Sequence, residues 1–212
     1  MIRALLSLLA LTVLAACGAD HVFASDDAVA RARYSDPAPP SITLFTSVNT
    51  RSNTGAHSAL LINGVQRVLF DPAGSFQHPA VPERNDVLFG ISPVLLSYYV
   101  DFQGTAPFHV IEQTIYVTPE VAEQVMRAAI AHGSVQKAEC TRGILAVLAG
   151  VPGFAGLPNT WFPKALSRGF GQLPGVHERI LSSTDGAIKR SLPGGPAAPP
   201  PPALAAAPIP AG

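Results

Sequence analysis

The dipeptide Asn63-Gly64, with an apolar run on each side, constrains the fold of this chain more than any other feature. Residues 57–63 and 65–71 are both rich in leucine, isoleucine, valine or phenylalanine. Asn-Gly between two such runs is the strongest short-range signal for a β-hairpin, because both residues readily adopt the positive φ that the tight turn needs. The sequence therefore predicts two antiparallel strands joined at this turn.

Two polar residues stand at the outer ends of this hairpin. His57 begins the first strand and Asp71 ends the second. A two-residue turn would pair His57 with Phe70 and send Asp71 to the opposite face, since side chains alternate along a strand. A three-residue turn over residues 63–65 would place His57 directly across from Asp71. The sequence leaves both registers open.

The rest of the predicted domain continues with strands and then helices. Residues 41–50 and 108–117 have the β-branched and aromatic composition of strands. Residues 72–86 are rich in proline and polar residues and predict a loop, long enough to suggest a role beyond connection. Helices are predicted for residues 92–102, 118–133, 138–150 and 162–171. This order predicts an α+β fold, an antiparallel sheet with helices packed on one face.

Both ends of the 212-residue chain carry segments that are not typical of a folded domain. Residues 1–16 contain one arginine and an apolar run that is too short to span a bilayer, as in a secretory signal. Residues 17–40 predict a flexible spacer, and residues 41–190 predict one domain of ordinary size. Residues 191–212 are dominated by proline, alanine and glycine and predict a disordered tail.

The end of the predicted signal, "VLAACG", resembles the bacterial lipobox, in which the cysteine is acylated and becomes the new N-terminus. The resemblance implies that Cys17 is lipidated and that acyl chains such as palmitate hold the protein at a bilayer. Gly18 does not resemble the aspartate that retains such proteins at the inner membrane, which implies the outer membrane of the cell envelope, facing the periplasm. The alternative is a plain signal peptide in which Cys17 is incidental.

The formal charge of the chain is zero, from 14 basic and 14 acidic residues, and no basic cluster stands out. Nucleic-acid binding is therefore not expected, because that partner requires a concentrated positive surface. A metal site made of His57, His78 and Asp71 lacks the spacing typical of metal ligands. We expect neither a metal nor another cofactor.

Cys140 is left alone once the lipobox cysteine is set aside. Outside the cytoplasm, such a thiol is either buried and inert or retained for its reactivity. Cys140 lies in the first turn of a predicted helix, where the positive end of the helix dipole lowers the pKa of a thiol. His57 is the candidate base, and Asp71 is the candidate residue that orients the imidazole, with His78 as a rival for that role.

Three segments carry a family resemblance: "GAHSALLIN", "VLFDPAG" and "AECTRGILAVL". In this order they resemble the circularly permuted papain-like fold of lecithin retinol acyltransferase-like proteins and related bacterial lipoproteins and amidases. In ordinary NlpC-type peptidases the cysteine helix instead precedes the histidine strand. The resemblance covers roughly residues 45–150 and implies Cys140 as nucleophile and His57 as base.

This resemblance implies a cysteine hydrolase or acyltransferase that acts on an amide or ester bond. The substrate would be a peptide of the cell wall peptidoglycan or a lipid acyl group, and the sequence does not separate the two. The alternative is a non-catalytic envelope lipoprotein that uses the same fold as a binding or assembly module. Trp161 and Phe162, which follow the cysteine helix, are predicted to pack in the core rather than to wall a cleft.

Overall fold

The computed structural model describes residues 22–182 as seven strands and five helices. The predicted signal peptide, the lipidation site Cys17 and the predicted tail at residues 191–212 lie outside the described residues and stay predictions. The strands are β1 Ser41–Asn49, β2 Gly55–Asn63, β3 Arg67–Phe70, β4 Glu83–Arg84, β5 Val87–Phe89, β6 Phe108–Tyr116 and β7 His177–Leu181. The helices are α2 Asp26–Ala32, α3 Pro93–Gln103, α4 Pro119–His132, α5 Cys140–Leu148 and α6 Pro163–Phe170.

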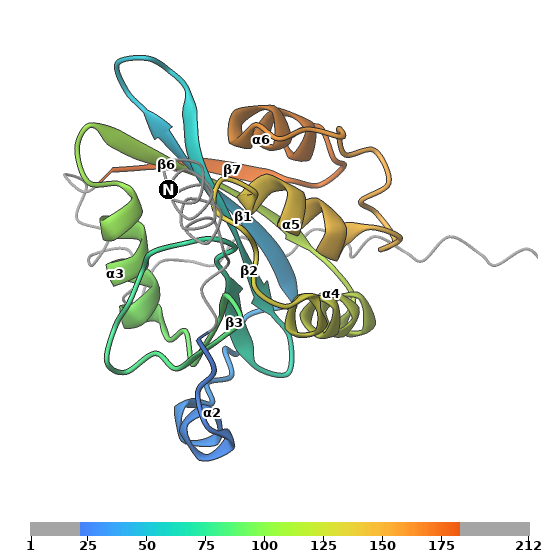
Figure 1. Ribbon diagram of the computed structural model, residues 1–212. Coiled ribbons are helices and arrows are strands. Elements are labelled where there is room, and N and C mark those ends of the chain that lie inside the picture. Colours follow the sequence, from blue (N-terminus) through green and yellow to red (C-terminus); the bar gives the residue numbers. More distant parts are fainter. Residues whose placement is uncertain (1–21, 183–212) are drawn as a thin grey trace, which may run out of the picture.

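All seven strands form one antiparallel sheet in the order β4-β5-β3-β2-β1-β6-β7 (Figure 1). The prediction of an α+β fold with an antiparallel sheet is therefore confirmed at this level. Strand β1 lies between β2 and β6, and seven of its nine residues are buried. A strand with both faces buried must be covered by other elements on both sides.

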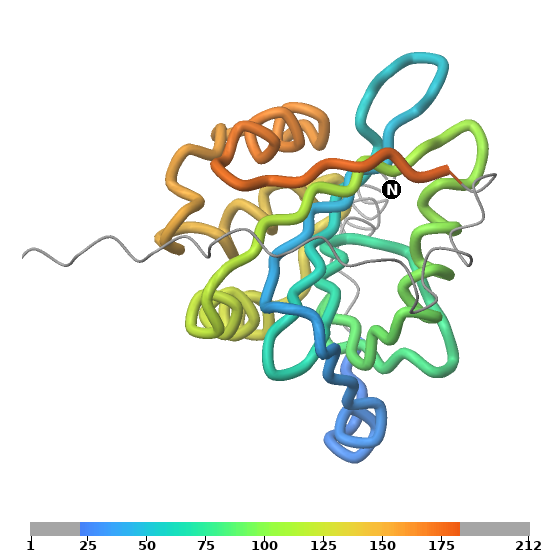
Figure 2. Tube along the Cα trace, turned by 180° about the vertical axis from the view of Figure 1, so that it is seen from behind, coloured from blue at the N-terminus to red at the C-terminus, as the bar shows by residue number. Residues whose placement is uncertain are grey.

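Helices cover both faces of the sheet, whereas the sequence predicted them on one face only. Helices α4, α5 and α6 lie together on one face, and α3 lies on the other, as the two opposite views show (Figures 1 and 2). Alternate residues of the strands point to the two layers: Leu44 and Leu60 belong to the core under α4 to α6, and Phe45 and Leu61 to the core that contains Tyr99 of α3. Helices lie on both faces because the strands are apolar almost throughout and therefore offer both faces for burial.

The structure places the start of the folded region before residue 41, within the segment of residues 17–40 that the sequence predicted as a flexible spacer. Residues 26–32 form α2, capped by the side chain of Ser25. Arg67 of β3 forms an ion pair with Asp36 and donates its backbone N–H to the carbonyl of Tyr34. These contacts hold the segment against the sheet, because Asp36 pairs with a guanidinium that is only 11% exposed. The sequence pattern did not reveal this pairing.

The hairpin forms as predicted, but in a register that differs from both expected ones. Asn63 pairs with Arg67 and Leu60 pairs with Phe70, so the loop consists of residues 64–66. Helix α4 stabilises this three-residue loop, because the carboxylate of Glu123 accepts the backbone N–H of Val65 at 2.9 Å. Asp71 therefore follows the last paired residue of β3 and is not directly opposite His57.

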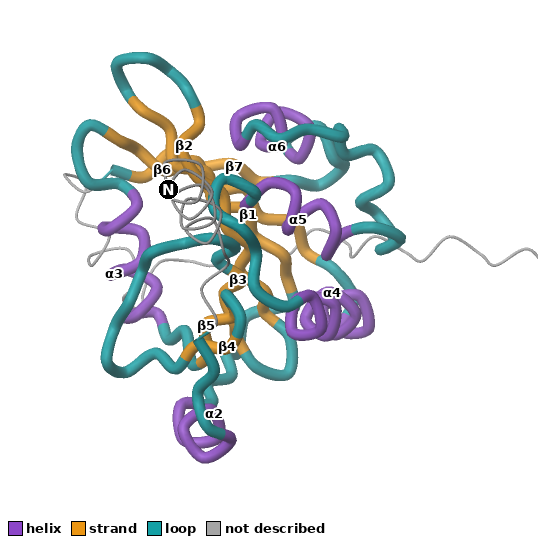
Figure 3. Tube along the Cα trace, viewed as in Figure 1, coloured by secondary structure: helices purple, strands orange, loops and turns teal. Residues whose placement is uncertain are grey.

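The predicted helix starts agree with the capping contacts. Thr118 accepts the N–H of Val121 at the start of α4, and Ser92 accepts the N–H of Leu95 at the start of α3, each followed by proline. A hydroxyl cap accepts one of the N–H groups that a helix start leaves unpaired, and a proline at the first helical position has no N–H that needs a partner. Figure 3 shows the long loop between β3 and α3, which carries only the short strands β4 and β5. Within residues 22–182, no helix combines the length and apolarity that crossing a bilayer requires.

Candidate active site

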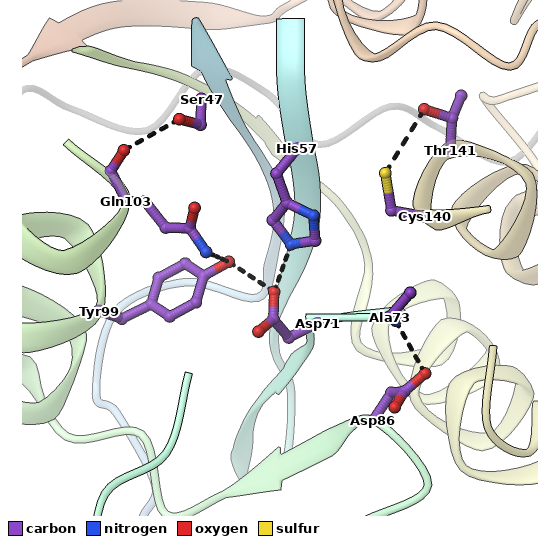
Figure 4. Close-up of polar contacts among 9 residues, drawn as sticks. All are labelled: Ser47, His57, Asp71, Ala73, Asp86, Tyr99, Gln103, Cys140 and Thr141. Atoms are coloured by element: carbon purple, nitrogen blue, oxygen red, sulfur yellow. Dashed lines mark hydrogen bonds and ion pairs between the residues drawn. The ribbon is translucent and has the colours of Figure 1, made fainter. Parts of the chain in front are cut away.

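His57 lies between Asp71 and Cys140 in the structure (Figure 4). Strand β3 pairs with β2 only from Leu60 to Asn63, so the first residues of β2, which include His57, have no β3 neighbour on that edge. Helix α5, which begins at Cys140, packs against β2, and the Cys140 thiol accepts the backbone N–H of Ser58. Because β3 is short, the start of α5 can lie beside His57 at this edge of β2.

Asp71 contacts His57 although the two residues are not directly paired. Leu61 is opposite Leu69, so His57 and Asp71 both point to the face of the sheet that carries α3. Asp71 Oδ1 accepts a hydrogen bond from His57 Nε2 at 2.6 Å, and the aspartate side chain is only 3% exposed. This bond fixes the ring so that Nδ1 is the nitrogen left to face the thiol.

Tyr99 completes the surroundings of the aspartate and was not identified from the sequence. Its hydroxyl donates to Asp71 Oδ1 at 2.7 Å, and Gln103 Nε2 donates to the tyrosine oxygen at 3.2 Å. Burial and the negative charge of Asp71 hold the pKa of Tyr99 well above its usual range, so the hydroxyl stays a donor. Ser47, the cross-strand partner of His57, donates to the carbonyl oxygen of Gln103 at 2.9 Å and joins α3 to the sheet.

The environment of Cys140 favours the thiolate. Burial of this thiol would raise its pKa, but the hydrogen bond and positive charge of His57 outweigh burial, with help from the backbone N–H of Ser58 and the hydroxyl of Thr141. The pKa of Cys140 is therefore below its usual value. The first N–H groups of α5 have no partners within the helix and add positive charge at this position.

Asp71 and Cys140 together raise the pKa of His57. Burial would lower the pKa of His57, but the charge and hydrogen bond of Asp71, together with those of Cys140, raise it from 6.5 to about 10. A thiol with a lowered pKa beside an imidazole with a raised pKa exists as a thiolate–imidazolium pair between the two values. This is the charge state of a nucleophile and its proton donor, ready for reaction with a carbonyl.

We expect Tyr99→Phe to lower the free energy of unfolding by about 1–3 kcal/mol, because a buried hydrogen bond to a carboxylate is lost. Tyr98→Phe is the matched control on the same helix, since Tyr98 is 49% exposed and stacks on His78. That change should stay within about 0.5 kcal/mol. Urea unfolding of the two variants measures the difference, and equal stabilities would show that the Tyr99 hydroxyl does not support Asp71.

His78 does not contact His57 in the structure, although the sequence left it open as the residue that orients the imidazole. Its ring stacks on Tyr98 with the centroids 5.5 Å apart, and its Nδ1 accepts the backbone N–H of Ala80 at 3.2 Å. Asp71 contacts the imidazole of His57 instead. No group of three or more His, Cys, Asp or Glu side chains in the described part of the chain is arranged to hold a metal ion.

Trp161 and Phe162 lie at the surface, contrary to the prediction that they pack in the core. They are 55% and 72% exposed. Arg142, in the first turn of α5, stacks over the Trp161 ring at 5.6 Å and hydrogen-bonds to Asn159. The contact with the guanidinium keeps the exposed indole near the start of the cysteine helix.

A cavity of about 440 Å³ lies beside the loop that follows Asp71. Its lining includes residues 73–77, Asp86, Val135 and Lys137. Its size is within the range of small-molecule sites. The cavity thus borders both the loop that follows the aspartate and the loop that precedes Cys140.

Comparisons of the chain with protein-family models, curated proteins and solved structures found no match. The geometry of Cys140, His57 and Asp71 is therefore the basis on which a function is inferred.

Proposed function

We propose that this protein is an envelope lipoprotein with a cysteine hydrolase or acyltransferase site that acts on an amide or ester bond. The observation that carries the proposal is the position of His57, with one nitrogen bonded to Asp71 and the other facing Cys140 at a helix N-terminus. A nucleophile, a base and a residue that orients the base are the three parts that thiol catalysis needs.

The proposed reaction follows from the charge state of the pair. The Cys140 thiolate attacks the carbonyl carbon, and N–H groups at the start of α5 stabilise the oxyanion. His57 donates its proton to the leaving amine or alcohol as the bond to the carbonyl breaks, which leaves a thioester on Cys140. His57 then removes a proton from water, or from an acceptor alcohol or amine, as that group attacks the thioester. The acyl product leaves, and the Cys140 thiolate and the His57 imidazolium are restored.

The proposal includes a circularly permuted papain-like fold, with the lipid anchor on Cys17 and a location at the outer membrane. Support for the fold comes from the order of the elements, since the histidine strand β2 precedes the cysteine helix α5, and from the antiparallel sheet against which α5 packs. Peptidoglycan peptides and lipid acyl groups are the substrate classes that this resemblance implies. Both occur at the envelope, where a lipid-anchored enzyme would meet them.

The test is turnover of an activated acyl ester, such as a p-nitrophenyl ester, and of peptides from the cell wall, by the wild type and by Cys140→Ala. We expect the ester to be hydrolysed and a thioester adduct on Cys140 to be trapped, and both to disappear in the variant. Because His57 must be protonated to release the leaving group, hydrolysis of amides should decline as the pH rises through about 10. Unchanged turnover in Cys140→Ala would contradict the proposal, and an unreactive thiol would favour the non-catalytic module.

A further inference from the structure

Asp86 connects the two loops that flank the site. Its Oδ2 accepts the backbone N–H of Ala73 at 3.0 Å and the backbone N–H of Val135 at 2.8 Å. Ala73 follows Asp71 by two residues, and Val135 precedes Cys140 by five. A single carboxylate oxygen therefore joins the segment that carries the orienting aspartate to the segment that leads into the cysteine helix.

The backbone of Asp86 reinforces this connection. Its carbonyl accepts the N–H of Asp71 at 2.8 Å, so main chain and side chain of one residue hold both loops. Asn85, its neighbour, accepts the hydroxyl of Ser134 at 3.1 Å. The side chains of Val135 and Pro72 lie so close to Gly143 that a Cβ there would be 2.9 and 3.2 Å from them. The joined loops thus contact α5 one turn after Cys140.

Strain and burial show that this arrangement is costly to form. Four residues other than glycine around these two loops have φ between 46° and 69°, a region that side chains disfavour: Ala73, Asn85, Asp86 and Ala138. Asp86 is only 6% exposed, and burial raises the pKa of its carboxyl while the two N–H groups lower it. Strained backbone of this kind persists where surrounding contacts determine it, and it is common at functional sites.

We propose that Asp86 is a positioning residue of the active site, which sets the distance between Cys140 and His57 by joining the loop at residue 73 to the loop at residue 135. The inference rests on the proposed function, because it assigns a role in the chemistry of that same thiol. Asp86 acts through backbone groups, and it need not touch a substrate.

The test is the rate at which iodoacetamide alkylates Cys140 below neutral pH in the full chain. Mass spectrometry of the tryptic peptide of residues 138–142 reads this rate separately from that of Cys17. The variants are Asp86→Ala, which removes the acceptor, and Asp86→Asn, which keeps an acceptor oxygen but without the charge that strengthens both bonds. Thermal unfolding of each variant shows whether it folds cooperatively.

The direction of the change in the alkylation rate distinguishes a positioning role of Asp86 from a simple effect of its charge. Removing a nearby negative charge by itself favours the thiolate and speeds alkylation. Glu139→Gln is the matched control, because Glu139 adjoins Cys140 and its side chain makes no cap hydrogen bond. We expect alkylation to be unchanged or faster in this control, since only a charge is removed.

In the Asp86 variants we expect the opposite: alkylation about threefold slower in Asp86→Asn and about tenfold slower in Asp86→Ala, because the thiolate loses its imidazolium partner. Should the alanine variant not fold, the asparagine variant alone decides. An alkylation rate in folded Asp86→Asn equal to or above that of the wild type would overturn the role of Asp86. Ordinary thiol reactivity in the wild type would instead reject the proposed function, so the two failures are distinguishable.

Discussion

Replacing His57 by alanine is expected to slow alkylation of Cys140 below neutral pH by about tenfold or more, because each unit of thiol pKa changes the thiolate fraction about tenfold. In the wild type, the imidazolium offsets the burial of the thiol. Without it, burial dominates and the pKa of Cys140 rises. Iodoacetamide labelling across pH, read at the peptide of residues 138–142, measures the shift.

His78→Ala is the control for this experiment, because His78 is stacked on Tyr98 and was the rival candidate for contact with His57. We expect its labelling profile to match that of the wild type. Equal profiles for His57→Ala and the wild type would mean that the histidine does not act on the thiol. Slower alkylation of Cys140 in His78→Ala would show that His78 also acts on the thiol.

Gly74→Ala is expected to slow the alkylation of Cys140 nearly as much, because it displaces Asp71. A Cβ at residue 74 would lie 2.0 Å from Asp71 Oδ2 and 2.3 Å from its Cγ. The carboxylate cannot turn aside freely, because its other oxygen is bonded to His57 and Tyr99. The variant must therefore break these bonds or move the loop, at a cost of about 1–3 kcal/mol for overpacking.

The measurements for Gly74→Ala are urea unfolding and the labelling profile of Cys140. We expect lower stability and an alkylation rate below neutral pH that falls about tenfold, since the imidazolium loses its carboxylate partner. Gly156→Ala is the matched control, because a Cβ at that residue meets no atom within 4 Å. A Gly74→Ala variant as stable and as reactive as Gly156→Ala would show that the loop accommodates the methyl group without moving Asp71.

Local patterns predicted much of this fold because the signals were complete within short segments. The Asn63-Gly64 hairpin and the capped helix at residues 119–132 both formed where the sequence indicated. The register of the hairpin did not follow from the turn, whose loop is also held by a hydrogen bond from Val65 to Glu123, 58 residues away. A contact over that separation leaves no local trace in the sequence.

The reactive residues of the candidate site were predicted from the sequence, but the residues that hold them in place were not. Cys140 and His57 were visible as a lone thiol at a helix start and a histidine at a strand start. Tyr99 looked like one of several apolar residues of a helix, because nothing in its neighbourhood indicates that α3 covers the second face of the sheet. Asp86 looked like an ordinary loop residue, since its role depends on backbone groups from two distant segments.

The most direct test of the account is a pH titration of the Cys140 thiolate, followed by its ultraviolet absorbance in the wild type with Cys140→Ala as the blank. The same samples, labelled with ¹⁵N in histidine, report the protonation of His57 by NMR. The account predicts a thiolate that forms well below the usual thiol pKa while His57 stays protonated up to about 10. A thiol that titrates at or above its usual value, beside an imidazole that loses its proton near 6.5, would contradict the ion pair and with it the proposed catalytic site.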